Sequence, residues 1–189
     1  MVSSFSFHSA RWGAALGVLL TALSLQASTT AVVSGRSEVV ATFKQMGVSV
    51  EGRFQRFEGD IRFDPATPEA ASAMLVIDTA SFDLGLPDYN AEVRKPEWFD
   101  SAAHPQARFS ADGLKPLGDQ RFRADGTLTL KGKTTPLSAD LTVTEADGHR
   151  RFEGEVTIDR THYGIGDEAW DGVVDDAVRV RFRIAQALD

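Results

Sequence analysis

The sequence predicts an all-β domain of about eight antiparallel strands with one short helical lid segment. Apolar and polar residues alternate through most of the chain, as they do on strands with one buried face. Short turns rich in Gly and Asp separate the alternating segments, which favours antiparallel neighbours. Only residues 87–109 form a long stretch without this alternation. A sandwich and a closed barrel both satisfy this pattern.

The first strands are expected over residues 37–44, 50–57, 59–64 and 73–78. In each of them every second residue is apolar, so one face is buried and the other is wet. Gly52 and Gly59 stand where a strand of a barrel has to bend sharply. The inward residues of this half include Val39, Ala41, Phe43, Ile61, Phe63, Leu75 and Ile77.

The second half of the chain repeats the pattern over residues 107–112, 121–130, 137–143, 151–158 and 178–184. Lys131-Gly132 and Asp147-Gly148 are expected as hairpin turns. We expect loops over residues 117–120 and 160–172.

Residues 87–109 are expected to leave the sheet, cross one end of it as a lid, and re-enter. Tyr89, Val93 and the pair Trp98-Phe99 are spaced roughly as on a short helix, which Pro96 interrupts.

The inward set mixes large Phe residues with small ones: Ala41, Ala107, Ala124, Gly126, Ala139 and Gly154. Small residues would leave the middle of an eight-stranded barrel under-filled and able to hold a ligand. The alternative is that neighbouring Phe rings fill this space, and composition does not decide between the two.

Composition limits the classes of partner. The 189 residues suffice for one domain, and the net charge is −7. Removal of residues 1–27 takes away one charged residue, Arg11, and brings the net charge to −8. An acidic chain argues against nucleic acid and anionic membranes as partners. The absence of Cys excludes disulfides and thiolate metal sites.

The N-terminus has the pattern of a secretory signal peptide. Arg11 precedes a short apolar core, and small residues follow. We expect a signal peptide over residues 1–27, with Ala31 as an alternative cleavage position, and one domain over residues 28–189. A membrane anchor is the rival interpretation, but the strongly apolar part is about a dozen residues, short of the roughly 20 that a spanning helix needs. The mature protein is then expected to be periplasmic, with no stable membrane span.

Motifs for catalysis, metals and nucleotides are weak. Gly132-Lys133-Thr134 lacks the upstream Gly of a phosphate-binding loop. No two of the histidines His104, His149 and His162 have ligand spacing. An acidic run, Asp167, Glu168, Asp171, Asp175 and Asp176, lacks the full calcium-loop pattern and is expected to be a solvated loop. We therefore expect no metal, no cofactor and no enzyme activity.

Arg179, Arg181 and Arg183 form a basic row on the last strand. If that strand pairs with the one before it, Glu153 and Glu155 are expected to form cross-strand ion pairs with this row.

Five segments of the chain stand out together by their order and spacing: GRFQRFEGDIRFDP at 52–65, AMLVIDTASFD at 73–83, YNAEVRKPEWFDSAAHPQARF at 89–109, GTLTLKGKTTPL at 126–137 and DRTHYGIG at 159–166. With these segments the chain resembles the YceI-like family of exported proteins. Better-known members of that family have Arg-Asp-x-His-Leu in the lid, from which Tyr89, Asn90 and Glu92 depart.

The resemblance implies a lipocalin-like antiparallel eight-stranded barrel whose apolar tunnel holds a polyisoprenoid or isoprenoid-quinone-like lipid, and it brings no catalytic residues. On this interpretation the protein sequesters or transports the lipid as cargo, and a homodimer is left open. The alternatives are a stress-related structural or interaction protein with a barrel filled by its own side chains, and a lipid-modifying enzyme. The expected tunnel wall is Val39, Phe43, Phe54, Ile61, Phe63, Leu75, Ile77, Phe109, Leu128 and Phe182, with Tyr89, Trp98 and Phe99 closing the lid end.

Overall fold

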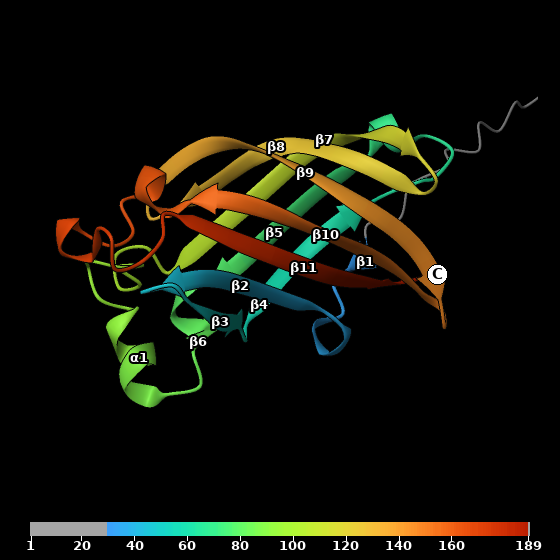
Figure 1. Cartoon of the computed structure of the whole chain (residues 1–189). Helices are drawn as coiled ribbons and strands as arrows, with labels where there is room; N and C mark the ends of the chain where they lie inside the picture. The colour runs from blue at the N-terminus through green and yellow to red at the C-terminus, as the bar shows by residue number, and fades with distance from the viewer. Residues whose placement is uncertain (1–29, 189) are drawn as a thin grey trace, which may run out of the picture.

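A single antiparallel sheet that curls round on itself makes up the fold (Figure 1). A computed structural model describes residues 30–188. In this range the order of strands in the sheet is β1-β4-β5-β7-β8-β9-β10-β11-β2-β3-β6, and all the pairs are antiparallel. The strands are β1 Thr30–Ala31, β2 Glu38–Gln45, β3 Val48–Phe54, β4 Phe57–Arg62, β5 Ser72–Asp78, β6 Phe82–Asp83, β7 Gln106–Gly118, β8 Arg121–Leu130, β9 Lys133–Ala146, β10 His149–Asp159 and β11 Ala177–Ala187.

In the part of the chain that the structure describes, helical structure occurs only in the connections between strands. The α-helix α1 is Pro87–Glu92. The 3₁₀ helices are η1 Ser34–Arg36, η2 Pro68–Ala70, η3 Thr79–Ser81, η4 Arg160–Tyr163 and η5 Glu168–Trp170.

Tight hairpin turns join the long strands from β7 to β10. Both residues of the turns at Lys131-Gly132 and Asp147-Gly148 have positive φ, as the twist of a two-residue hairpin requires. These two expected turns are confirmed.

The N-terminal segment ties the two sides of the barrel together. Thr30 and Ala31 pair with β4, while Val32 bridges to Gln186 on β11. The Val32 N–H donates to Gly59 O at 3.0 Å, and the Val33 N–H donates to Ala185 O at 2.8 Å. Because Val32 contacts both β4 and β11, the segment joins these two strands.

The expectation of about eight strands undercounts the eleven that the described residues form. Two of the additional strands, β1 and β6, have two residues each, too few for an alternating pattern. The expected strand over residues 50–57 is divided at residues 55–56, so that Phe57 begins β4.

Strand β7 continues to Gly118, beyond its expected end at Asp112 and into the expected loop. A bulge between Ala111 and Leu114 shifts the register. Gly113 has φ +82 there, and its N–H donates to Ala71 O at 2.7 Å. The bulge interrupts the period of two, so the alternation ends while the strand does not.

Gly52 leaves room for a neighbouring aromatic ring, whereas the sequence led us to expect a sharp bend of the strand there. A Cβ at this position would lie 2.2 Å from Cζ of Phe82, whose ring lies over the strand. Phe82 is 3% exposed and packs against Phe54, with their ring centroids 4.7 Å apart.

The basic row on β11 is balanced as expected. Arg183 pairs with Glu153 on β10 and with Glu38 on β2, and Arg179 pairs with Glu155 at 3.5 Å. The prediction of cross-strand ion pairs is confirmed.

The predicted signal peptide, residues 1–27, and residue 28, where the mature domain would begin, lie outside the described residues. Across residues 30–188, no helix is long and apolar enough to cross a membrane.

Candidate ligand-binding site

Two cavities lie inside the barrel, with volumes of about 150 Å³ and 130 Å³. Their walls have five residues in common, so the two cavities adjoin each other, and together we call them the tunnel. The shared residues are Val39, Ile77, Leu128, Ile158 and Val180. We call the section that includes Trp98 the lid-end section and the other the far section.

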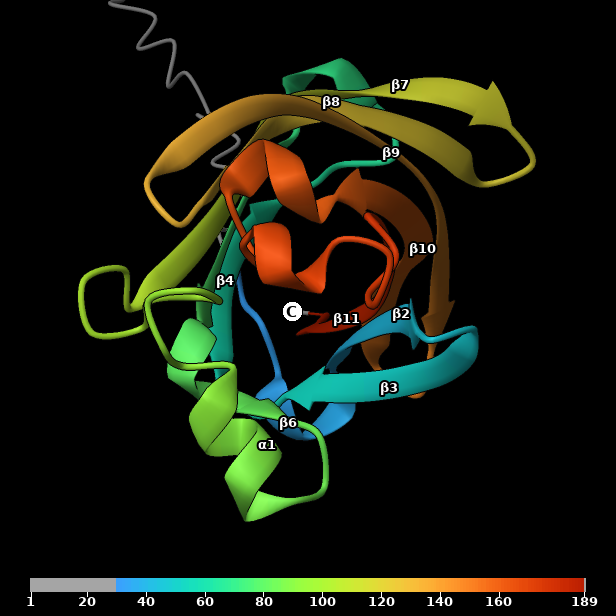
Figure 2. The same ribbon diagram turned by 60° about the vertical axis from the view of Figure 1, so that its left-hand side comes forward.

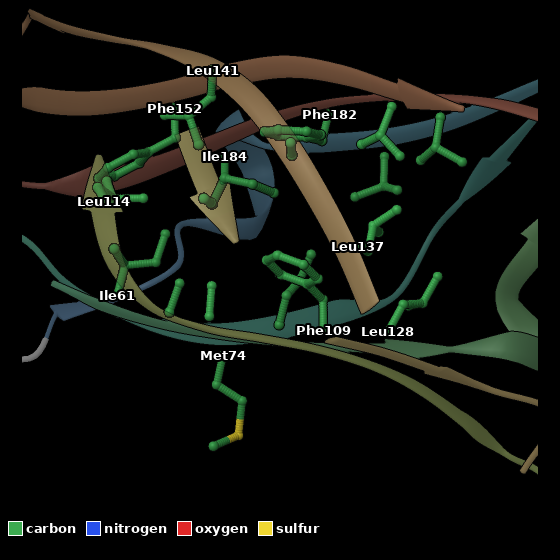
Figure 3. Close-up of a pocket in the computed structure, with 18 of the residues that line it drawn as sticks. Ile61, Met74, Phe109, Leu114, Leu128, Leu137, Leu141, Phe152, Phe182 and Ile184 are labelled. Carbon is green, nitrogen blue, oxygen red and sulfur yellow. The ribbon is translucent and has the colours of Figure 1, made fainter. Parts of the chain in front are cut away.

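The far section is almost wholly apolar (Figure 3). Ile61, Leu114, Leu141, Phe152 and Ile184 point into one common space from strands on opposite sides of the barrel. Met74 points to the other side of its strand and is 44% exposed, although part of it borders the section.

Aromatic rings and the lid close the lid-end section. Phe99 packs edge-on against Phe54 and Phe82, with ring centroids 5.9 Å and 5.4 Å apart. Val93 and Trp98 complete this wall from the same lid segment. The Trp98 ring packs against Trp170 of η5 at 4.9 Å.

Two segments share the lid end of the barrel. Figure 2 shows the loop that follows β10, residues 160–176, across the end of the barrel and α1 at its rim. The Gly166 N–H donates to Glu97 O at 2.7 Å, which joins the loop to the lid. The lid therefore closes the barrel together with this loop, and not alone as the sequence suggested.

Asn90 anchors α1 to β6. Its Oδ1 accepts the Leu84 N–H at 2.7 Å, and its Nδ2 donates to Asp83 Oδ1 at 2.8 Å. The Gly85 N–H also donates to Asp83. Donation from Asn90, then from Gly85, lowers the pKa of the Asp83 carboxyl because both hydrogen bonds favour the charged form.

Arg160 organises the second closing segment and is 2% exposed. Its guanidinium donates to Ile165 O at 2.8 Å, Val174 O at 2.9 Å and Asp175 O at 3.2 Å. It also pairs with Asp176 at 3.0 Å. A buried charge needs such partners, and here they fix both ends of the loop.

Arg160 also borders the lid-end section, a role that the sequence analysis did not assign to it. It belongs to the segment DRTHYGIG, but an Arg in a loop carries no sign of burial in the sequence. The acidic run in this loop supplies Asp176 to Arg160, and Asp171 lies 3.8 Å from it.

Eleven of the thirteen predicted site residues border the tunnel. The far section includes Ile61, Leu75, Phe109 and Phe182; the lid-end section includes Phe43, Phe54, Trp98 and Phe99; Val39, Ile77 and Leu128 border both. Contact of these residues with a ligand stays a prediction.

Phe63 and Tyr89 border neither section. Phe63 is buried, but its ring packs edge-on against Phe122 and Phe152 at 5.4 Å and 5.6 Å, where it helps to plug the end of the barrel away from the lid. Tyr89 is 58% exposed, and its helix α1 lies at the rim of the barrel (Figure 2). The expectation that Tyr89 closes the lid end was wrong.

The small inward residues have two different roles. Ala41, Ala107, Ala124 and Ala139 border the tunnel directly. At Gly154 a Cβ would lie 2.6 Å from the Phe182 ring, so this glycine makes room for an aromatic ring. Phe rings thus fill part of the interior, as one alternative held, and the tunnel remains between them.

Metal chemistry has no visible basis in the described residues. Between residues 30 and 188, no group of three or more His, Cys, Asp or Glu side chains is placed to hold a metal ion.

Comparison with known proteins gives a consistent result. A family model described as a YceI-like domain matches residues 31–186. The crystal structure of BcnA from Burkholderia cenocepacia is 36% identical, covers 82% of this chain and 98% of its own, and has a TM-score of 0.79. A polyisoprenoid binding domain from Saccharophagus degradans has a TM-score of 0.72 at 18% identity, covering 86% of this chain and 100% of its own, which shows a common fold.

Two curated sequence relatives are described as UPF0312 proteins. A UPF0312 protein of Shewanella baltica is 32% identical over 133 residues, which are 66% of this chain and 70% of the relative. Another, from Azotobacter vinelandii, is 35% identical over 86 residues, or 46% of this chain. That alignment spans 45% of the Azotobacter protein, about half of its length.

Proposed function

The chain belongs to the YceI-like family, and from this premise we propose that it is an exported binding protein that holds an isoprenoid lipid in its barrel. The cargo is a polyisoprenoid or an isoprenoid-quinone-like molecule. The protein sequesters the lipid or carries it, and it performs no reaction on it.

The observation that carries this proposal is the apolar tunnel formed by the two adjoining sections. Its two sections share five aliphatic wall residues and extend from Leu114 to the lid. Burial of apolar surface is worth about 25 cal/mol per Å². A long, thin hydrocarbon chain places nearly all of its surface against such a wall.

A structural relative supports the class of ligand. The solved domain from Saccharophagus degradans is described as a polyisoprenoid binding domain, and it shares the fold of this chain. An isoprenoid chain is branched, flexible and uncharged, which suits a tunnel whose far section has Ser72 as its one polar side chain.

An aqueous compartment is where a lipid carrier is needed. The N-terminal sequence has the pattern of an export signal, which favours the periplasm as the place of function. There the barrel would shield the cargo from water.

The decisive experiment is native mass spectrometry of the exported protein after gentle purification, followed by solvent extraction and lipid analysis. We expect a stoichiometric additional mass that extracts as an isoprenoid. A mass equal to that of the protein alone, unchanged after incubation with isoprenoids and quinones, would contradict the proposal and favour a structural role.

A further inference from the structure

Two buried hydrogen-bond donors of the lid segment have no partner within residues 30–188: the indole N–H of Trp98 and the hydroxyl of Ser101. Ser101 does not border the tunnel, whereas Trp98 does. Trp98 Nε1 is buried and makes no hydrogen bond with any of the residues that the structure describes. The ring of Trp98 borders the lid-end section of the tunnel. Buried indole N–H groups nearly always have an acceptor, so this donor needs an explanation.

The other polar group of this section cannot take the same role. Arg160 borders the section, but its guanidinium already donates to three backbone carbonyls and pairs with Asp176. The N–H of Trp98 is therefore the donor of this wall that is left for another molecule.

The far section offers nothing comparable. Among the described residues that line it, Ser72 has the one polar side chain, and the others are hydrocarbon side chains, the thioether Met74 and Gly113. A lipid with one polar end thus meets a chemically asymmetric tunnel, apolar at the far end and with a hydrogen-bond donor at the lid.

The charges around the lid end disfavour an anionic ligand. Burial lowers the pKa of Lys131, and the negative charges of Asp100, Glu97 and Asp167 oppose this shift. The Lys131 ammonium donates a hydrogen bond to Gly164 O at 2.6 Å. Asp171 and Asp176 face Arg160. Lys131 and Arg160 are therefore engaged within the protein, and the carboxylates around them would repel a diphosphate.

We propose that the lid-end section receives the head group of the lipid, and that the Trp98 indole N–H, after rotation of the ring, donates a hydrogen bond to a neutral oxygen of that group. The oxygen is the carbonyl of a quinone or the hydroxyl of a phenol or alcohol. The lipid then lies with its tail toward Leu114 and its head beneath the lid. This proposal rests on the proposed function and adds the orientation and the head-group chemistry.

The test compares three ligands whose prenyl tails have equal length: a quinone, the plain hydrocarbon and the diphosphate. We expect the protein to bind the quinone about 3- to 10-fold more tightly than the hydrocarbon, the contribution of one net hydrogen bond. The diphosphate is expected to bind more weakly than the quinone. In Trp98→Phe, which keeps an aromatic ring without the donor, the preference for the quinone over the hydrocarbon is expected to vanish.

Trp170→Phe is the matched control, because Trp170 packs on Trp98 but does not border the tunnel. It should keep the preference. A preference that survives Trp98→Phe, or a diphosphate that binds more tightly than the quinone, would overturn this inference and leave the proposed function intact. Failure of all three ligands to bind would overturn both.

A second measurement does not depend on a variant of Trp98. In ¹H–¹⁵N spectra of the exported protein, Trp170→Phe identifies the indole signals. We expect the Trp98 N–H resonance to move downfield with the quinone and to stay in place with the hydrocarbon. An unchanged resonance in the quinone-bound protein contradicts the hydrogen bond.

Discussion

At the scale of single residues, the tunnel depends on where side chains are small. Ala111, Ala124 and Ala139 are 3–5% exposed and lie on adjacent strands, β7, β8 and β9. They border the far section, where larger side chains would occupy the space. The small size of these alanine side chains therefore leaves the space that forms the far section of the tunnel.

Ala139→Leu should narrow the tunnel without unfolding the barrel. The added carbons extend into existing space, so we expect a change in the free energy of unfolding of about 1 kcal/mol or less, instead of the 1–3 kcal/mol typical of over-packing. Binding of a long isoprenoid should fall by at least tenfold. Lipid titration and urea unfolding of the same samples measure both effects.

Thr142→Leu is the control for this substitution, because Thr142 lies on the outward face of the same strand, paired with Glu153. It should leave lipid affinity unchanged. Equal losses of affinity in the two variants would show that the Leu acts through the strand and not through the tunnel.

Arg160→Met should destabilise the loop that shares the lid end. Removal of the guanidinium leaves several buried carbonyls without donors, and each such group costs about 1–3 kcal/mol. We expect a loss of roughly 3 kcal/mol in the free energy of unfolding. Arg179→Met, which breaks an exposed pair on β11, should cost under about 1 kcal/mol. Similar values for the two variants in urea unfolding would contradict the role given to Arg160.

At the scale of elements, the lid is a separate unit attached at a few points. Asn90 joins α1 to β6, Glu97 O accepts from the loop after η4, and Thr79 holds the exit of the lid through Pro105 O and His104 O. Such sparse attachment allows the lid to open while the long strands stay paired.

Asn90→Ala should loosen α1 and leave the barrel intact. It removes both side-chain hydrogen bonds between the helix and residues 83–84. We expect faster amide hydrogen exchange over residues 84–95 and unchanged exchange in β8 to β10. Protection that falls equally in the lid and the strands would show that the lid is part of the barrel's cooperative unit.

The same anchor should depend on pH. Because hydrogen bonds lower the pKa of Asp83 in the folded protein, the charged carboxylate favours folding above its ordinary pKa. That contribution is lost as the pH falls through the lowered value. Amide resonances of α1 should therefore shift as the pH falls through that lowered value, and in Asp83→Asn this shift should be absent.

The elements also show what a sequence can predict. The alternation of polar and apolar residues predicts long strands with one solvent-exposed face, such as β8 and β9. It also predicts which residues of these strands point inward. The bulge at Gly113 and the pairing of β1 with β4 depend on partners distant in sequence, which no local pattern encodes. Tyr89 was misplaced for a related reason, because helical spacing defines a face of α1 without showing which way that face points.

At the scale of the whole molecule, the two ends of the barrel differ in how firmly they are closed. Away from the lid, Phe63 packs between Phe122 and Phe152, and the Arg150 guanidinium lies 5.1 Å from the Phe63 ring and donates to its backbone oxygen. At the lid end, the unpartnered donor of Trp98 weakens the closed state. The lid end is therefore the more easily opened of the two.

Because the tunnel is closed at the end away from the lid, its affinity for a lipid should depend on the length of the lipid's tail. Each isoprene unit adds apolar surface, and each buried CH₂ contributes up to about 0.8 kcal/mol. We expect affinity to rise with tail length and then to level off once the tail reaches the plug around Phe63. Competition titrations with quinones of increasing tail length measure this curve. In Ala139→Leu the plateau should come at a shorter tail, because the added side chain lies in the far section. An affinity that does not depend on tail length, or a plateau that the substitution does not move, would show that the tail lies outside the barrel.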